Sequence, residues 1–201
     1  MKSYWHSIVL FIVISKDVHS ENDFANVPQQ HRDKVQEVKK MIEGNLTLVI
    51  LLRTNWPPHI NNTRCWKSRK NSTGVFMPQQ YLKYEQKLTG SQGWEKRNLL
   101  ALYAAGLRGG GIPTFAMFTY GEGMKPDKDT TGYFTILYAK RPCFVVQSQA
   151  DPSICLTWVR RRRIDIVRQE CAAIFYAACV NSTTVVQKYN RTVCEQGLEL
   201  P

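Results

Sequence analysis

The sequence is short of the residues on which most enzyme sites depend. It contains four histidines among 201 residues, and only His31 and His59 lie beyond the first twenty. Neither histidine stands beside a nucleophile or a cluster of metal ligands. The patterns C-x-x-C, H-E-x-x-H and G-x-S-x-G are absent, which removes the usual signatures of redox, zinc-protease and serine-hydrolase sites. We therefore expect a protein that is not an enzyme and that carries no metal or cofactor.

Long hydrophobic runs are missing as well. The apolar run at Ile8–Ile14 has seven residues, whereas a membrane-spanning helix needs about 20. The run fits the core of a secretory signal peptide, with Val18 and Ser20 placed for cleavage before Glu21; a buried N-terminal strand is the alternative. We expect residues 1–20 to be a signal peptide, and residues 21–201 to form a single secreted domain without membrane insertion.

Acidic residues are few. The chain has 16 Asp and Glu against 27 Lys and Arg, for a formal net charge of +11. Lys2, Lys16 and Asp17 contribute +1 of this, so loss of the first twenty residues leaves +10. Such an excess indicates an anionic partner, and secretion argues against nucleic acid. The cations concentrate in residues 160–163 and 64–70, which are alternatively solvated loops or strand ends.

Six cysteines and five glycosylation acceptors both indicate an extracellular protein. An even number of cysteines without metal-type spacing predicts three disulfides in an oxidising compartment, with 15 pairings open at this point. The acceptor triplets N-x-[ST] would lie on the surface if occupied. They begin at Asn45, Asn61, Asn71, Asn181 and Asn190.

Hydrophobic periodicity predicts a mainly β protein. Residues 28–43 have the spacing of a helix that ends at Gly44, and residues 46–52 form an apolar, β-rich run. A second amphipathic helix is expected over residues 164–178. Further strands are expected at 76–88, 96–105, 113–120, 133–140, 144–149, 154–160 and 184–188. This order predicts an eight-stranded antiparallel up-and-down barrel with an N-terminal helix and a C-terminal helix packed on it, wide enough for one small ligand.

A composite motif in the C-terminal third carries a family resemblance. It consists of a strand that begins with cysteine, a strand of the type C-x-x-W-V, a helix with two cysteines, and a final cysteine after a short strand. Its segments are Cys143–Val146, Cys155–Val159, Ile164–Cys171 with Phe175 and Cys179, and Val185-Val186 with Cys194. Over residues 133–194 the chain resembles the tick salivary lipocalins, the histamine-binding-protein family of the calycin superfamily. Over residues 21–130 the likeness is architectural: a helix, a strand, and then a cysteine, here Cys65, at the next strand.

The resemblance implies a structure and a role. It implies the disulfides Cys65–Cys194, Cys143–Cys171 and Cys155–Cys179, which would staple the C-terminal helix and the tail to the barrel. It also implies a monomeric lipocalin in saliva that sequesters a small inflammatory or haemostatic mediator of the host, either an amine or a lipid. A barrel used only as a scaffold for binding a host protein, and a protein that binds sulfated glycans, are the alternatives.

Two departures from the family pattern bear on the ligand. The family members that this chain resembles and that capture biogenic amines typically carry two acidic residues in this motif. One is an Asp directly after its first cysteine, and the other is a Glu two residues before its tryptophan. This chain has Phe144 and Leu156 there, and only the aromatic Trp158 remains. Burying an ammonium without a carboxylate costs several kcal/mol. We therefore expect an apolar or anionic lipid, such as an eicosanoid or fatty acid, in place of histamine or serotonin.

The anion partner and the state of the interior are further expectations. Arg160 lies two residues beyond Trp158, so on a regular strand it points inward near the rim and could meet a ligand carboxylate. A barrel filled by side chains is the alternative to a ligand cavity. A second amine site also stays open, because the sequence does not place Glu85, Glu95 and Glu122 inside or outside the barrel.

Overall fold

The computed structural model describes residues 27–58, 62–71, 77–88, 90, 93–166 and 169–195. The predicted signal peptide and Asn61 lie outside these ranges. The strands are β1 (Leu48–Thr54), β2 (Thr63–Lys70), β3 (Gln79–Lys87), β4 (Trp94–Arg108), β5 (Ile112–Tyr120), β6 (Gly132–Lys140), β7 (Cys143–Ser148), β8 (Cys155–Arg160) and β9 (Val186–Lys188). The helices are α2 (Gln29–Ile42), α3 (Gln169–Cys179), α4 (Arg191–Cys194) and the 3-10 turns η2 (Glu122–Met124) and η3 (Arg161–Ile166).

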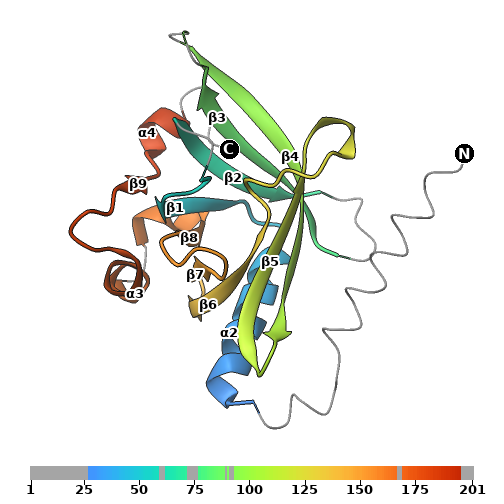
Figure 1. Cartoon of the computed structure of the whole chain (residues 1–201), viewed down its shortest axis with the longest axis vertical. Coiled ribbons are helices and arrows are strands. Elements are labelled where there is room, and N and C mark those ends of the chain that lie inside the picture. The colour runs from blue at the N-terminus through green and yellow to red at the C-terminus, as the bar shows by residue number, and fades with distance from the viewer. Residues whose placement is uncertain are drawn as a thin grey trace, which may run out of the picture.

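The first eight strands form a closed antiparallel barrel, which confirms the predicted fold (Figure 1). Strands β2 to β8 pair in sequence order, and β8 then pairs with β1. The barrel closes where Leu48 and Val49 of β1 pair with Ser68 and Lys67 of β2. Beyond this short contact the other half of β1 pairs with β9, so the ninth strand extends the sheet outside the barrel.

Helix α2 covers one end of the barrel, here called the α2 end (Figure 1). Its apolar side chains, among them Val38 and Ile42, are buried against the barrel interior. Its first turn reaches the β4–β5 turn, where His31 Nδ1 lies 3.0 Å from the Gly111 carbonyl oxygen. At its other end Gln80 Nε2 donates to the Ile42 carbonyl oxygen at 2.6 Å. The opposite end, where β1 ends and β2 begins, is called the far end.

A bulge in β1 decides which residues of that strand face inward. The pairing register with β8 shifts between Ile50 and Leu52. Ile50 belongs to the interior cluster, whereas both Leu51 and Leu52 belong to the outer one. An extra residue in one strand reverses the alternation of sides beyond it. Arg53 is therefore turned toward the interior.

A second apolar core lies outside the barrel wall, beneath α3 and the tail. Helix α3 packs on β6, β7 and β8. Three disulfides cross this core: Cys143–Cys171, Cys155–Cys179 and Cys65–Cys194. These are the pairs that the family resemblance implies.

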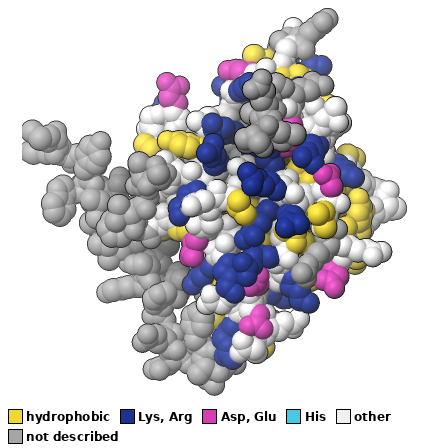
Figure 2. Space-filling model, turned by 180° about the vertical axis from the view of Figure 1, so that it is seen from behind, with side chains coloured by type: hydrophobic (Ala, Val, Ile, Leu, Met, Phe, Trp, Pro, Cys, Tyr) yellow, Lys and Arg dark blue, Asp and Glu magenta, His cyan; other side chains and the backbone are white. Residues whose placement is uncertain are grey.

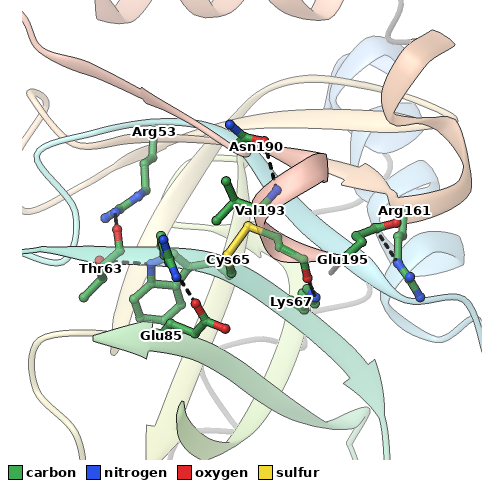
Figure 3. The surroundings of a disulfide bond; sticks show 12 residues. Arg53, Thr63, Cys65, Lys67, Glu85, Arg161, Asn190, Val193 and Glu195 are labelled. Atoms are coloured by element: carbon green, nitrogen blue, oxygen red, sulfur yellow. Dashed lines mark hydrogen bonds and ion pairs between the residues drawn. A yellow bond between two sulfur atoms is a disulfide. The ribbon is translucent and has the colours of Figure 1, made fainter. Parts of the chain in front are cut away.

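The last bridge, Cys65–Cys194, lies among polar contacts that hold the tail to β2 and η3 (Figure 3). Lys67 Nζ donates to the Cys194 carbonyl oxygen at 2.5 Å, and Arg161 Nε lies 2.7 Å from a Glu195 carboxylate oxygen. The Asn190 side chain accepts from the Val193 amide at 3.1 Å and caps α4. The hydrogen bond from Arg161 lowers the pKa of Glu195, so this carboxylate stays ionised in mild acid.

The C-terminal third differs from expectation in two places. The predicted helix over residues 164–178 is divided into η3, which ends at Ile166, and α3, which begins at Gln169. The buried face of α3 consists of Cys171, Phe175 and Cys179. Elsewhere, the hydrophobic pattern marks neither β2 nor the short helix α4, because both mix charged and apolar residues, and only the family resemblance implies a strand at Cys65.

Candidate functional site in the barrel

Phe144, Leu156 and Trp158 all lie inside the barrel and are 0% exposed. Phe144 and Trp158 are paired across β7 and β8, and their rings stack with centroids 6.2 Å apart. Tyr103 and Phe115 contact the same indole with centroids 6.1 and 6.4 Å away. These spacings are those of packed aromatic pairs. The middle of the barrel is therefore occupied by four aromatic side chains.

The indole of Trp158 brings an unsatisfied donor into this apolar centre. Its Nε1 is buried and has no hydrogen-bond partner among the described residues. Buried donors without an acceptor are uncommon, and leaving one unpaired costs about 1–3 kcal/mol. The neighbouring Tyr103 hydroxyl is paired, at 2.8 Å from Ser68 Oγ, and burial raises its pKa so that it stays protonated. An acceptor group of a ligand at the barrel centre would satisfy Trp158.

Arg53 is the one buried charged residue of the described part of the chain, and nothing in the hydrophobic pattern marked it. Arg53 stands opposite Leu156 in the β1–β8 register, so both side chains lie on the interior face. Its side chain is 5% exposed, and its guanidinium donates to the Thr63 carbonyl oxygen (Figure 3) and to the Trp56 carbonyl oxygen. The guanidinium carbon also lies 5.9 Å from the Trp66 ring centroid. Burial lowers the pKa of Arg53 to about 10, so it remains cationic at neutral pH.

The buried polar and charged side chains of the described residues include no Asp or Glu. Of the glutamates left open by the sequence, Glu85 pairs with Arg64 at 2.8 Å and Glu95 with Arg97 at 3.2 Å. Glu122 is exposed. Arg53 thus keeps a positive charge at the far end of the interior, and no described carboxylate pairs with it. A buried cation without a counter-ion creates an electrostatic preference for anions.

Arg160 lies at the α2 end, so it is separated from Arg53 by the length of the barrel. It pairs in register with Leu48 at the start of β1. Leu48 belongs to the interior cluster, so Arg160 lies on the inward face of β8 at the rim of the barrel, where it lines a cleft of about 280 Å³ that is described further below. The structure thus places the predicted apolar residues together in the interior, and it places Arg160 two residues beyond Trp158 at the rim, far from Arg53.

Comparisons with known proteins agree with this geometry. Residues 27–196 match the family described as tick histamine binding protein. The chain belongs to this family. No curated protein matches the sequence. Among solved structures the fold is similar to "Japanin from Rhipicephalus appendiculatus bound to cholesterol", with a TM-score of 0.55 and 13% sequence identity over 74% of this chain and 95% of that one.

Membership of the histamine-binding family identifies the chain as a tick salivary lipocalin, a ligand-binding type of fold. Within the described ranges no helix is long and apolar enough to cross a membrane. The same ranges contain no group of three His, Cys, Asp or Glu side chains that could hold a metal ion. Among the glycosylation acceptors Asn45, Asn181 and Asn190 are exposed and Asn71 is half-buried, while their occupancy stays a prediction.

Proposed function

We propose that this lipocalin is a secreted protein that sequesters a host mediator with an apolar body and an anionic group. The proposal rests on the lining of the barrel interior. It contains a buried arginine and an unpaired indole N–H, and no Asp or Glu is buried among the described residues. Such a lining favours a fatty acid or eicosanoid and disfavours a biogenic amine. The family name and the cholesterol named for the similar structure support a small-molecule ligand in this barrel.

The charge of the ligand follows from the cost of burial. An ammonium near Phe144 and Leu156 would lose its water shell without gaining a carboxylate, at a cost of several kcal/mol. The affinity of a micromolar ligand is about 8 kcal/mol in total, so this penalty would remove most of the binding. A carboxylate beside Arg53 instead gains a charge-assisted hydrogen bond from a cation that is already desolvated.

The strand register supports a position for the ligand. Arg53 faces Leu156, and Ile50 faces Trp158, so the interior face of β1 and β8 runs from the guanidinium to the indole. We place the anionic group at Arg53 and the apolar body along Leu156 toward Trp158. The rings around Trp158 are packed against one another. Entry of a ligand therefore requires these rings to move, and we expect binding to change tryptophan fluorescence.

The test is to titrate oleate and oleyl alcohol against tryptophan fluorescence in the wild type and in the Arg53→Gln variant. We expect oleate to bind the wild type more tightly than the alcohol does, because only oleate carries a charge for Arg53. Arg53→Gln should weaken oleate binding by about tenfold or more, which corresponds to one charge-assisted hydrogen bond of about 1.5–3 kcal/mol. Binding of the alcohol should change little.

Arg97→Gln is the matched control, since it removes the same charge from an exposed side chain on β4. Arg53→Lys retains the positive charge and should recover part of the oleate affinity. Equal losses in Arg53→Gln and Arg97→Gln would show that the buried guanidinium does not contact the ligand. Failure of the wild type to bind either compound would contradict the proposed function itself.

A further inference from the structure

The outer cleft near the α2 end is built almost entirely from cationic and polar residues. Its wall comes from three segments that are distant in sequence: the turn before β1, the end of β2 and the junction of β8 with η3. Its volume is about 280 Å³. The lining residues are Asn45, Leu46, Thr47, Arg69, Arg160, Arg161 and Arg162. Four arginines thus meet around one depression, and no carboxylate lines it.

The charges in this cleft are poorly compensated within the chain. Only Arg161 has a carboxylate partner, Glu195, whereas Arg69, Arg160 and Arg162 have none among the described residues. The Nε of Arg160 is buried without a hydrogen-bond acceptor. Burial, followed by repulsion from Arg141, lowers the pKa of Arg160, and the attraction of the more distant Glu37 offsets only part of this effect. The repulsion between these arginines and the unpaired Nε of Arg160 both destabilise the empty cleft. A bound anion would offset the repulsion and supply the missing hydrogen-bond acceptor.

The cationic surface continues beyond the cleft. The side chain of Lys67, next to Arg161, has its pKa lowered by burial and then by that arginine. Arg141 and Arg163 add positive charge near Arg160, although Arg141 is itself paired with Glu37 at 3.3 Å. Figure 2 shows that Lys and Arg side chains gather across the middle of one face of the molecule. A single small anion would neutralise only the arginines of the cleft. A chain with repeated negative groups would neutralise both these arginines and the cationic side chains around the cleft.

We infer that this cleft binds a sulfated glycan chain, with a sulfate group seated among Arg69, Arg160 and Arg162. Three disulfides place the protein in an oxidising, extracellular setting, where sulfated glycans are the abundant linear polyanions. Arginine is suited to the role because its planar fork donates two parallel hydrogen bonds to an oxyanion. The cleft lies at the rim of the α2 end, whereas Arg53 lies at the far end, so glycan and mediator would bind independently. Glycan binding would then retain the protein at the place where the mediator is released.

The experiment measures binding to immobilised heparin at several NaCl concentrations. The wild type should remain bound at physiological salt, and its affinity should fall steeply as salt rises. The triple variant Arg69→Gln/Arg160→Gln/Arg162→Gln should bind at least tenfold more weakly and depend less on salt. The matched control Lys87→Gln/Lys125→Gln/Lys128→Gln removes the same charge from exposed lysines outside the cleft, and it should change affinity much less.

Further arms keep the result interpretable. Arg69→Gln/Arg162→Gln alters only exposed side chains and serves if the triple variant does not fold. Chemically desulfated heparin should not bind. Asn45→Gln removes the glycosylation acceptor on the cleft wall, and heparin affinity should be equal to or higher than that of the wild type. Oleate binding by the triple variant should be unchanged, which separates failure of this inference from failure of the proposed barrel function.

Three outcomes would overturn the inference. One is elution of the wild type from heparin below physiological salt. Another is an equal loss of affinity in the arginine and lysine triple variants, which would reduce the interaction to net charge. The third is binding of single-stranded DNA as tight as that of heparin, which would show a generic response to polyanions in place of a site for sulfate groups.

Discussion

Removing the Cys65–Cys194 bridge with the Cys65→Ala/Cys194→Ala variant should lower the free energy of unfolding by about 5 kcal/mol in the chain-entropy treatment of disulfides. The two cysteines are 129 residues apart, and a cross-link that closes so long a loop restricts the unfolded chain strongly. This bridge ties the tail to β2, while the other two tie α3 to the barrel. Urea unfolding followed by far-ultraviolet circular dichroism measures the change.

The matched control is Cys155→Ala/Cys179→Ala, which opens a loop of 24 residues. The same treatment gives about 3.4 kcal/mol for this loop, so the control should be less destabilised by about 1.5 kcal/mol. Both variants replace two buried cysteines by alanine, which makes their packing losses similar. A larger loss in the control would mean that the attachment of α3, and not closure of the long loop, dominates the stability contributed by the bridges.

Replacement of Trp158 by alanine should lower the free energy of unfolding by about 3–5 kcal/mol, the usual cost of removing a large aromatic side chain from a packed core. Trp158 is 0% exposed and contacts three other aromatic rings. Trp94→Ala is the control, because Trp94 is 37% exposed on β4 and its loss should cost far less. Urea unfolding should be followed by circular dichroism, because both substitutions remove a tryptophan and therefore change the fluorescence signal.

The same variant tests the position of the ligand. Trp158→Ala should weaken oleate binding more than Arg162→Ala does, because Arg162 lines the outer cleft and not the interior. Isothermal titration calorimetry measures both variants without a fluorescent reporter. Equal affinities in the two variants would place the ligand away from Trp158, even if the stability result agrees with the packing.

The strands could be predicted where the hydrophobic pattern is regular. Strand β5 begins and ends within one residue of its predicted limits, and so does β6. The hydrophobic pattern does not mark β2, because its charged residues outnumber its apolar ones, of which Trp66 faces inward and Cys65 faces the outer core. Only the family resemblance implies a strand at Cys65. The start of α3 was predicted too early. The apolar residue Ile164 continues the helical spacing, but it belongs to a separate 3-10 turn.

The site was predictable only in part. The carboxylate-to-apolar changes at residues 144 and 156 could be seen directly, since the family resemblance fixes their positions. Arg53 could not be found, because the bulge between Ile50 and Leu52 reverses the inward alternation and leaves no mark in the hydrophobic pattern. The outer cleft depends on the meeting of residues 45–47, Arg69 and residues 160–162, which is a property of the closed barrel.

Parallel calorimetric titrations of histamine and arachidonate into the wild-type protein test the central claim most directly. The claim is that the barrel interior selects an anionic lipid over an amine. Arg53 is buried there, and no Asp or Glu is buried among the described residues. Arachidonate should bind with micromolar affinity or better, and histamine should give no saturable heat at concentrations up to about 1 mM. Saturable histamine binding below one micromolar, with no response to arachidonate, would contradict this account of the barrel.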